Sequence, residues 1–80
     1  MMAKLPQSSS SELKPEFNLN SKAYPWRSGL TVNQLLIQIE AEGPGVAVEC
    51  NGVVVRRVER QTKLIQEGDQ VEIVRLVGGG

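Results

Sequence analysis

Residues 30–57 read LTVNQLLIQIEAEGPGVAVECNGVVVRR, and this stretch predicts one amphipathic helix followed by one β-hairpin. Apolar residues recur at the i, i+3, i+4 and i+7 spacing of a helical stripe, namely at Val32, Leu35, Leu36 and Ile39. Thr31 is a suitable N-cap, because its hydroxyl can accept a hydrogen bond from a free amide of the first turn. Gly43 is the expected C-cap glycine, and the proline after it prevents continuation. Ile37 and Ala41 point away from the stripe.

Two β-branched runs joined by Asn51-Gly52 predict the hairpin. Asn-Gly is the strongest short hairpin signal, because both residues tolerate positive φ. Alternation divides the first run between two faces, with Val46, Val48 and Cys50 on one and Ala47 and Glu49 on the other. The connection that follows, VERQTKLIQEGD (residues 58–69), has room for one short helical turn and ends in a tight turn at EGD.

Two further strands are expected before the helix. In EFNLN, Phe17 and Leu19 alternate with asparagines at the period of a half-buried strand. Asn20 and Ser21 give a turn, and KAYPW returns as a second strand. Pro25 cannot donate a hydrogen bond to a sheet ladder, so this second strand is expected at the edge of the sheet.

The last strand is expected in QVEIVRLV, residues 70–77. If Val71 and Ile73 face the helix, Val74 and Leu76 lie on the opposite, open face of the sheet. We interpret these exposed apolar residues as a docking patch for partner enzymes. The simpler alternative is that both are only residues of high strand propensity.

The order of elements is therefore strand, strand, helix, strand, strand, turn, strand. It predicts an α+β fold of the ubiquitin-like β-grasp type, a five-stranded mixed sheet with one main helix packed across one face. In that fold the first and last strands are parallel neighbours at the centre of the sheet.

Three regions are expected along the chain. Residues 1–15, MMAKLPQSSSSELKP, contain four consecutive serines between two prolines and cannot bury enough surface to offset the entropy of ordering. We predict a disordered extension there, a β-grasp domain at residues 16–77 and a flexible glycine tail at residues 78–80. A chain of this size has a thin core, so it is expected to bind, carry or regulate rather than to catalyse alone.

Composition excludes several classes of function. Nine basic and nine acidic side chains cancel, so no overall field attracts nucleic acid or a membrane surface. Histidine is absent and Cys50 is the only cysteine, which excludes disulfide frameworks, Cys/His zinc sites and histidine-activated nucleophiles. The single cysteine fits a reducing compartment. Without an apolar run of membrane-spanning length or a secretory signal, the expected location is the cytoplasm.

Two groups of reactive or charged residues have a structural interpretation. Cys50 falls on the predicted core face with no basic neighbour in sequence, which favours a buried structural thiol over a redox or persulfide role. The connection carries a local basic group of Arg56, Arg57, Arg60 and Lys63. Acidic residues interrupt this group and Trp26 alone offers no stacking platform, so we expect a solvated hairpin end or a rim contact with an acidic partner rather than an RNA site.

The chain ends on three glycines, Gly78, Gly79 and Gly80. A terminal glycine carboxylate has no neighbouring side chain, so it can be threaded into a narrow tunnel of another enzyme. Glycine also adopts whatever extended path such a tunnel requires. The carboxylate becomes a useful electrophile once adenylation turns one oxygen into a leaving group.

FNLN, GLTVNQLL, VAVECNGVVVRR and LIQEGDQVEIVRLVGGG together resemble the ThiS family, within the wider ThiS/MoaD group of ubiquitin-like proteins. The resemblance covers residues 16–80 in order. It implies a sulfur carrier of thiamine thiazole biosynthesis, a protein co-substrate rather than an enzyme. An E1-like enzyme similar to ThiF would adenylate Gly80 with ATP and magnesium. A cysteine desulfurase or another donor would supply the sulfur, and a thiazole synthase similar to ThiG would receive it.

The same resemblance implies the site residues. Gly80 bears the adenylate and then the thiocarboxylate, and Gly78 and Gly79 form the narrow arm. The exposed Val74 and Leu76 of the last strand, with Val77, complete the expected partner-binding residues. No stably bound cofactor or metal is implied, and the free chain is expected to be a monomer.

The chain departs from the family pattern in three places. Its N-terminal extension is longer than usual, its first turn is Asn20-Ser21 where Asn-Gly is common, and VVVRRVERQ lacks the proline and aromatic that often follow the hairpin. Alternatives stay open. A MoaD-like carrier usually has a proline before Gly-Gly, which is absent here. Carriers for cysteine or homocysteine, a ubiquitin-like modifier of lysines, and a binding module with an inert tail are the others.

Overall fold

The computed structural model describes residues 14–76. The predicted extension, apart from Lys14 and Pro15, and the whole glycine tail lie outside these residues. The elements in chain order are β1 (Glu16–Leu19), β2 (Lys22–Pro25), α2 (Val32–Gln38), β3 (Val46–Cys50), β4 (Val53–Val54), the 3-10 turn η1 (Arg57–Glu59) and β5 (Gln70–Arg75). In this part of the chain no helix has the length and apolar character needed to cross a membrane.

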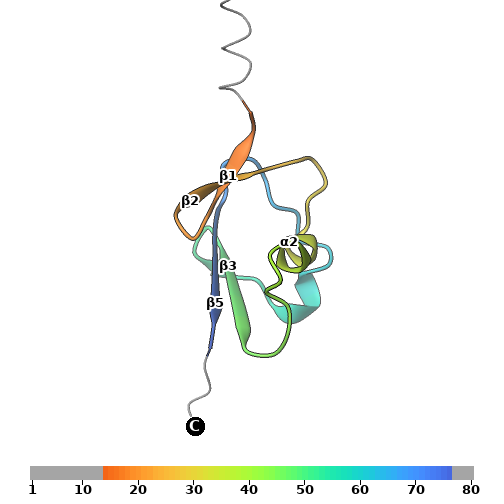
Figure 1. The fold of residues 1–80 in the computed structure, drawn as a ribbon. Helices are drawn as coiled ribbons and strands as arrows, with labels where there is room; N and C mark the ends of the chain where they lie inside the picture. The colour runs from red at the N-terminus through yellow and green to blue at the C-terminus, as the bar shows by residue number, and fades with distance from the viewer. Residues whose placement is uncertain (1–13, 77–80) are drawn as a thin grey trace, which may run out of the picture.

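The five strands form one mixed sheet in the order β2-β1-β5-β3-β4. β1 and β5 are parallel neighbours at its centre, whereas every other pair is antiparallel. α2 lies across one face of the sheet, and η1 follows at the end of that same layer (Figure 1). The predicted β-grasp architecture is confirmed, and β2, which contains Pro25, is an edge strand as expected.

The core lies between α2 and the inner face of the sheet. The stripe predicted on the helix is buried at Val32, Leu35 and Leu36, while Ile39 is half-buried. The sheet contributes alternate residues to the same core, namely Phe17, Val46, Val48, Cys50 and Val71. Each fully buried apolar side chain of this size stabilises the fold by about 1.5–3 kcal/mol.

The start of α2 is fixed by hydrogen bonds from two directions. The Thr31 hydroxyl accepts from the Gln34 amide at 3.1 Å, and the Gln34 side chain accepts from the Thr31 amide at 3.1 Å. The connection after β4 supplies further acceptors, because the Val32 amide donates to Lys63 O and the Asn33 amide donates to Arg60 O. The predicted N-cap is confirmed, and three otherwise free helical amides are satisfied.

The end of α2 differs from the prediction. The helix stops at Gln38, and Glu40 (φ +56°) rather than Gly43 closes it, although Gly43 also has a positive φ of +114°. The Ala41 amide donates to Leu36 O and the Glu40 amide to Ile37 O, which closes the helix in a Schellman arrangement. This early turn brings Ala41 back to pack against the core. The prediction that Ala41 points away was therefore wrong as well.

The hairpin forms as predicted around Asn51 and Gly52, both with positive φ. Its second strand is shorter than the run of valines suggested, because β4 pairs only with Glu49 and Cys50. Beyond β4, the Val55 amide donates to Val48 O at 2.8 Å and the Arg60 Nη2 donates to Val46 O at 2.7 Å. These two bonds complete the edge of β3 where β4 no longer covers it.

Candidate site at the end of the central strand

The described chain ends beside the start of β3. The antiparallel register pairs Arg75 with Val46, and the Leu76 amide donates to Gly45 O at 2.6 Å. β5 thus runs to the lower end of the sheet in Figure 1, where β3 begins. The predicted site residues Val77, Gly78, Gly79 and Gly80 lie outside the described residues. We refer to the end of β5, together with Gly45 and Asn20 that hold it, as the tail platform.

Gly45 allows β5 to approach this closely. Its φ is +80°, and a Cβ placed on it would lie 3.0 Å from the carbonyl oxygen of Leu76. A side chain at this position would meet backbone, which cannot move aside as a flexible side chain can. Glycine at this position therefore allows the close contact between residue 45 and the backbone at the end of β5.

Asn20 holds the other side of β5. β1 pairs with β5 only at Asn18 and Leu19, after which the chain turns away into β2. The Asn20 side chain extends the contact, since its Oδ1 accepts from the Ile73 amide at 2.8 Å and its Nδ2 donates to Ile73 O at 3.3 Å. The two hydrogen bonds of this side chain thus take the place of the backbone pairing that β1 no longer provides.

The two faces of β5 divide as the alternation predicted. Val71 is buried and Ile73 half-buried on the helix side, whereas Val74 and Leu76 are 52% and 64% exposed. Ala47 is the register partner of Val74 on the open face. The exposure is what a docking patch requires, and the role itself stays a prediction.

A network of polar side chains lies around Asp69, at the end of the sheet where β5 begins. Asp69 accepts hydrogen bonds from the Gln66 amide at 2.8 Å and from the Asn51 side chain at 3.0 Å, and the Cys50 thiol lies 3.5 Å from it. Partial burial opposes ionisation of Asp69. The hydrogen bonds from Gln66, Asn51 and Cys50 and the charge of Lys63 outweigh that effect and lower the pKa of the carboxyl.

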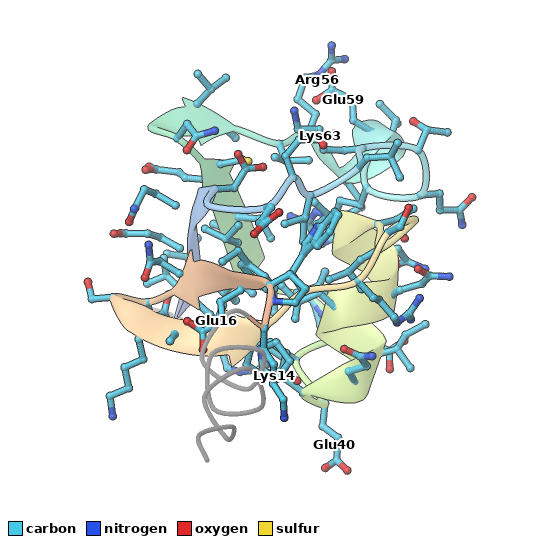
Figure 2. The ribbon with its side chains drawn as sticks, turned by 90° about the horizontal axis from the view of Figure 1, so that it is seen from above. Lys14, Glu16, Glu40, Arg56, Glu59 and Lys63 are labelled. Carbon is cyan, nitrogen blue, oxygen red and sulfur yellow. The ribbon has the colours of Figure 1, made fainter. Side chains whose placement is uncertain are left out.

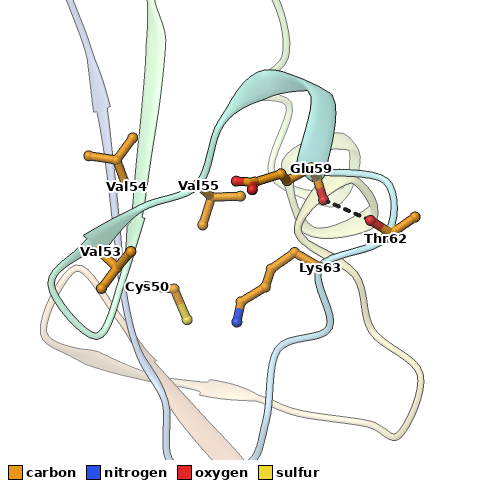
Figure 3. Close-up of a pocket in the computed structure, with 7 residues that line it drawn as sticks. All are labelled: Cys50, Val53, Val54, Val55, Glu59, Thr62 and Lys63. Carbon is orange, nitrogen blue, oxygen red and sulfur yellow. Dashed lines mark hydrogen bonds between the residues drawn. The ribbon is translucent and has the colours of Figure 1, made fainter.

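Cys50 lines a hollow of about 330 Å³ together with three valines, Glu59, Thr62 and Lys63 (Figure 3). The Lys63 ammonium points toward the thiol, a neighbour that sequence reasoning missed because the two residues are far apart in the chain. Burial and the nearby Asp69 carboxylate nevertheless raise the pKa of the Cys50 thiol, and Lys63 opposes them only in part. The predicted buried position is confirmed, since Cys50 is only 4% exposed.

Cys50 is also remote from the tail. It pairs with Val71 at one end of β5, and Arg75 lies four residues further along the strand. At about 3.3 Å per residue the separation is about 13 Å. The thiol and the tail platform therefore belong to different ends of the sheet.

Comparison with known proteins gives one consistent family. Residues 12–80 match the ThiS family. This chain belongs to the ThiS family. It is 31% identical over 61 residues to the sulfur carrier protein ThiS of Escherichia coli, a match that covers 76% of this chain and 92% of that protein. It also matches a crystal structure of the thiamine biosynthesis protein ThiS from Geobacter metallireducens, with a TM-score of 0.69, 31% identity, and coverage of 81% and 99% of the two chains.

A third relative is much longer than this chain. A thiazole synthase of Magnetococcus marinus is 35% identical over 65 residues, which cover 81% of this chain and 20% of that protein. The chain thus spans about a fifth of the length of this relative. A ThiS-like segment is accordingly one part of a larger protein that carries the name of a thiazole synthase.

The basic residues of this ThiS-family chain do not form one solvated patch. Arg56, Arg57 and Lys63 are exposed, and Figure 2 shows Arg56, Glu59 and Lys63 grouped at one end of the molecule. Arg60 is only 8% exposed, so its assignment to a solvated end was wrong. Burial, and then the charge of Arg57, lower the pKa of its guanidinium. Its function is to complete the edge of β3, a contact with no local sequence signal.

Proposed function

We propose that this chain is a sulfur carrier of thiamine thiazole biosynthesis and that Gly80 carries the sulfur as a thiocarboxylate. Membership of the ThiS family is the observation that carries the proposal. The sequence supports it, because three glycines follow a strand whose last described residues are fixed by Gly45 and Asn20. A rigid platform with a narrow arm suits delivery of a reactive end group into another protein.

The proposed chemistry replaces one oxygen of the terminal carboxylate by sulfur. An E1-like enzyme joins the Gly80 carboxylate to the α-phosphate of ATP, with magnesium, and releases pyrophosphate. Inorganic sulfide then attacks the carbonyl carbon and forms a C–S bond. With a cysteine desulfurase, the outer sulfur of its persulfide attacks instead, and a thiol reductant afterwards breaks the S–S bond to leave the thiocarboxylate. The C–O bond to AMP breaks, and AMP leaves with one of the original carboxylate oxygens. The carrier is consumed and regenerated as a co-substrate, and the catalytic groups belong to its partners.

The proposed partners follow from the same chemistry. An adenylating enzyme must accept the tail first, and a thiazole synthase then receives the sulfur. The thiazole synthase relative supports the second partner, because a segment similar to this chain occurs within it. We propose that Val74, Leu76, Val77 and the glycines contact these partners. The free thiol of Cys50 favours a reducing compartment, so we assign the reaction to the cytoplasm. We also propose that the free carrier is a monomer.

The intact mass of the chain tests the proposal most directly. The chain is incubated with the E1-like enzyme of the same organism, ATP, magnesium and inorganic sulfide. We expect a mass increase equal to the replacement of one oxygen by sulfur, lost on deletion of Gly80. An unchanged mass, with the enzyme active in pyrophosphate release, would contradict the carrier. Attachment to lysines of other proteins, without the sulfur form, would instead support a ubiquitin-like modifier.

The docking role of Val74 has its own control. Val74→Thr keeps the β-branched shape and changes only the polarity of an exposed side chain, so the fold should be unaffected. We expect the KM for the carrier in adenylation to rise about three- to tenfold. Val58→Thr is the matched variant, because Val58 is 77% exposed but lies in η1, in the layer on the helix side of the sheet and not on its open face (Figure 1). Equal kinetics for the two variants would remove Val74 from the interface.

A further inference from the structure

The open face of the sheet holds a pair of like charges in direct register. Glu49 of β3 is the antiparallel partner of Glu72 of β5, and both side chains are exposed. Residues directly opposite in neighbouring strands have Cβ atoms only about 4.5–5.5 Å apart. Two carboxylates at this spacing repel each other, and the arrangement destabilises the free sheet.

No basic strand residue on this face compensates the pair. Among the described strands, alternation places the charged residues Glu16, Glu49 and Glu72 on the open face. The only basic strand residues, Lys22 and Arg75, are register partners of Leu19 and Val46 and belong to the other set. The basic side chains Arg56 and Lys63 lie on the connection after β4 (Figure 2). A chain without net charge therefore presents an acidic sheet face.

This acidic pair adjoins the exposed apolar residues that lead to the tail. Val74 follows Glu72 by two residues on the same face, Ala47 is the register partner of Val74, and Leu76 is the next residue of that set. A partner that covers Val74 lies two residues, about 7 Å, from Glu72 along the strand and is therefore adjacent to the acidic pair. A partner surface with its own carboxylates would be repelled there, while a cation would bind both acids in a partly desolvated setting.

We propose that the open face of the sheet docks the adenylating enzyme through a basic side chain of that enzyme, seated between Glu49 and Glu72 and flanked by apolar contacts to Ala47, Val74 and Leu76. This inference rests on the proposed function and identifies the chemistry of its first partner. An arginine suits the position best, because its planar fork bonds two carboxylate groups at once. The repulsion within the free carrier is relieved in the complex, so the same two residues oppose folding and favour docking.

The test measures stability and binding on the same variants. Glu72→Gln and Glu49→Gln each remove the repulsion between the two carboxylates while keeping the size of the side chain. We expect each to raise the unfolding midpoint of the free chain by about 1–5 °C. Each should also weaken binding to the adenylating enzyme about three- to tenfold and reduce the dependence of that affinity on salt. Glu72→Lys should raise the midpoint further, by creating an attractive pair, and should abolish most of the binding.

Glu67→Gln is the matched control, because Glu67 is exposed in the turn before β5, at the end of the sheet away from the tail. Its binding and salt dependence should equal those of the wild type. Unchanged binding of Glu72→Gln and Glu72→Lys, while the wild type is adenylated, would overturn the docking proposal and leave the carrier function standing. A wild type that is neither bound nor adenylated by an active enzyme would overturn both. A fall in the midpoint for Glu72→Gln would show that the pair does not repel, which also contradicts the proposal.

Discussion

The side-chain amide of Asn20 bonds both backbone groups of Ile73, 53 residues away in the chain. The two bonds bridge β5 at the point where β1 leaves it for β2. The first turn of the domain therefore helps to position the strand that leads to the tail. Asn20 also has a φ of +50°, a conformation that asparagine tolerates better than most residues.

Asn20→Gly measures how much these two hydrogen bonds contribute to the stability of the fold. Glycine accepts the positive φ without strain, so the variant loses only the amide contacts. We expect the free energy of unfolding to fall by about 1–2 kcal/mol, measured by urea denaturation. Ser21→Gly is the matched variant, since Ser21 has a φ of +72° and its side chain makes no hydrogen bond within residues 14–76. Its free energy of unfolding should rise by about 1 kcal/mol, because glycine relieves the strain of the positive φ. Equal effects of the two changes would refute the bridging role.

Gly45→Ala should destabilise the platform more than Gly43→Ala does. Both positions have positive φ, so both variants carry a backbone strain of about 1–3 kcal/mol. Only at Gly45 does the new Cβ meet backbone, 3.0 Å from Leu76 O, whereas nothing lies within 4 Å at Gly43. We expect a further loss of about 1–2 kcal/mol for Gly45→Ala, together with faster hydrogen exchange of the Leu76 amide. Equal losses of stability for both variants would mean that β5 moves away from the new Cβ without an energetic cost.

Asp69 should make the stability of the domain depend on pH in the acid range. Its folded pKa is lowered, so its contribution is fully present above the unfolded pKa of about 3.9 and is lost as the pH falls through the folded pKa. Asp69→Asn should cost about 1–3 kcal/mol at neutral pH and flatten the dependence below pH of about 4. Glu67→Gln, a neighbour in the same turn, is the control. Parallel acid profiles for the wild type and Asp69→Asn would exclude this network as the cause.

Cys50→Ala should leave sulfur transfer intact. The thiol is buried, its pKa is raised by burial and by Asp69, and it lies at the far end of β5 from the tail. We expect unchanged thiocarboxylate formation and a loss of about 1 kcal/mol in stability, because a small buried side chain is truncated. Alkylation of the native wild type by iodoacetamide should be slow at neutral pH and rise only at alkaline pH. Loss of transfer with an intact fold would assign the thiol a chemical role.

The strands and turns were predictable because their signals are local. Asn51-Gly52 set the hairpin, Thr31 marked the start of the helix, and the alternation in β5 gave its two faces. The order of elements then allowed few arrangements, which is why the parallel pairing of β1 with β5 could be anticipated.

The remaining features depend on tertiary contacts that no local pattern shows. The helix ends at Gln38 because the chain must return Ala41 to the core, and packing there outweighs the strain at Glu40. Arg60 is buried because β4 is too short to cover β3, so a side chain supplies the missing donor to Val46. Lys63 approaches Cys50 only through the fold of the connection. The bonds of Asn20 to Ile73 likewise join residues from opposite ends of the domain.

The central position of β5 has a consequence for the folding of the newly synthesised chain. β5 joins β1 to β3, yet it is the last of the strands to emerge from the ribosome. A nascent or truncated chain that stops short of residue 70 has the segments of two hairpins and of α2 but lacks the strand that joins the hairpins, and an isolated hairpin is marginally stable at best in water. Such chains stay open to proteolysis, which removes unfolded protein. We therefore expect degradation to remove preferentially the chains whose synthesis stops before the strand that leads to the tail.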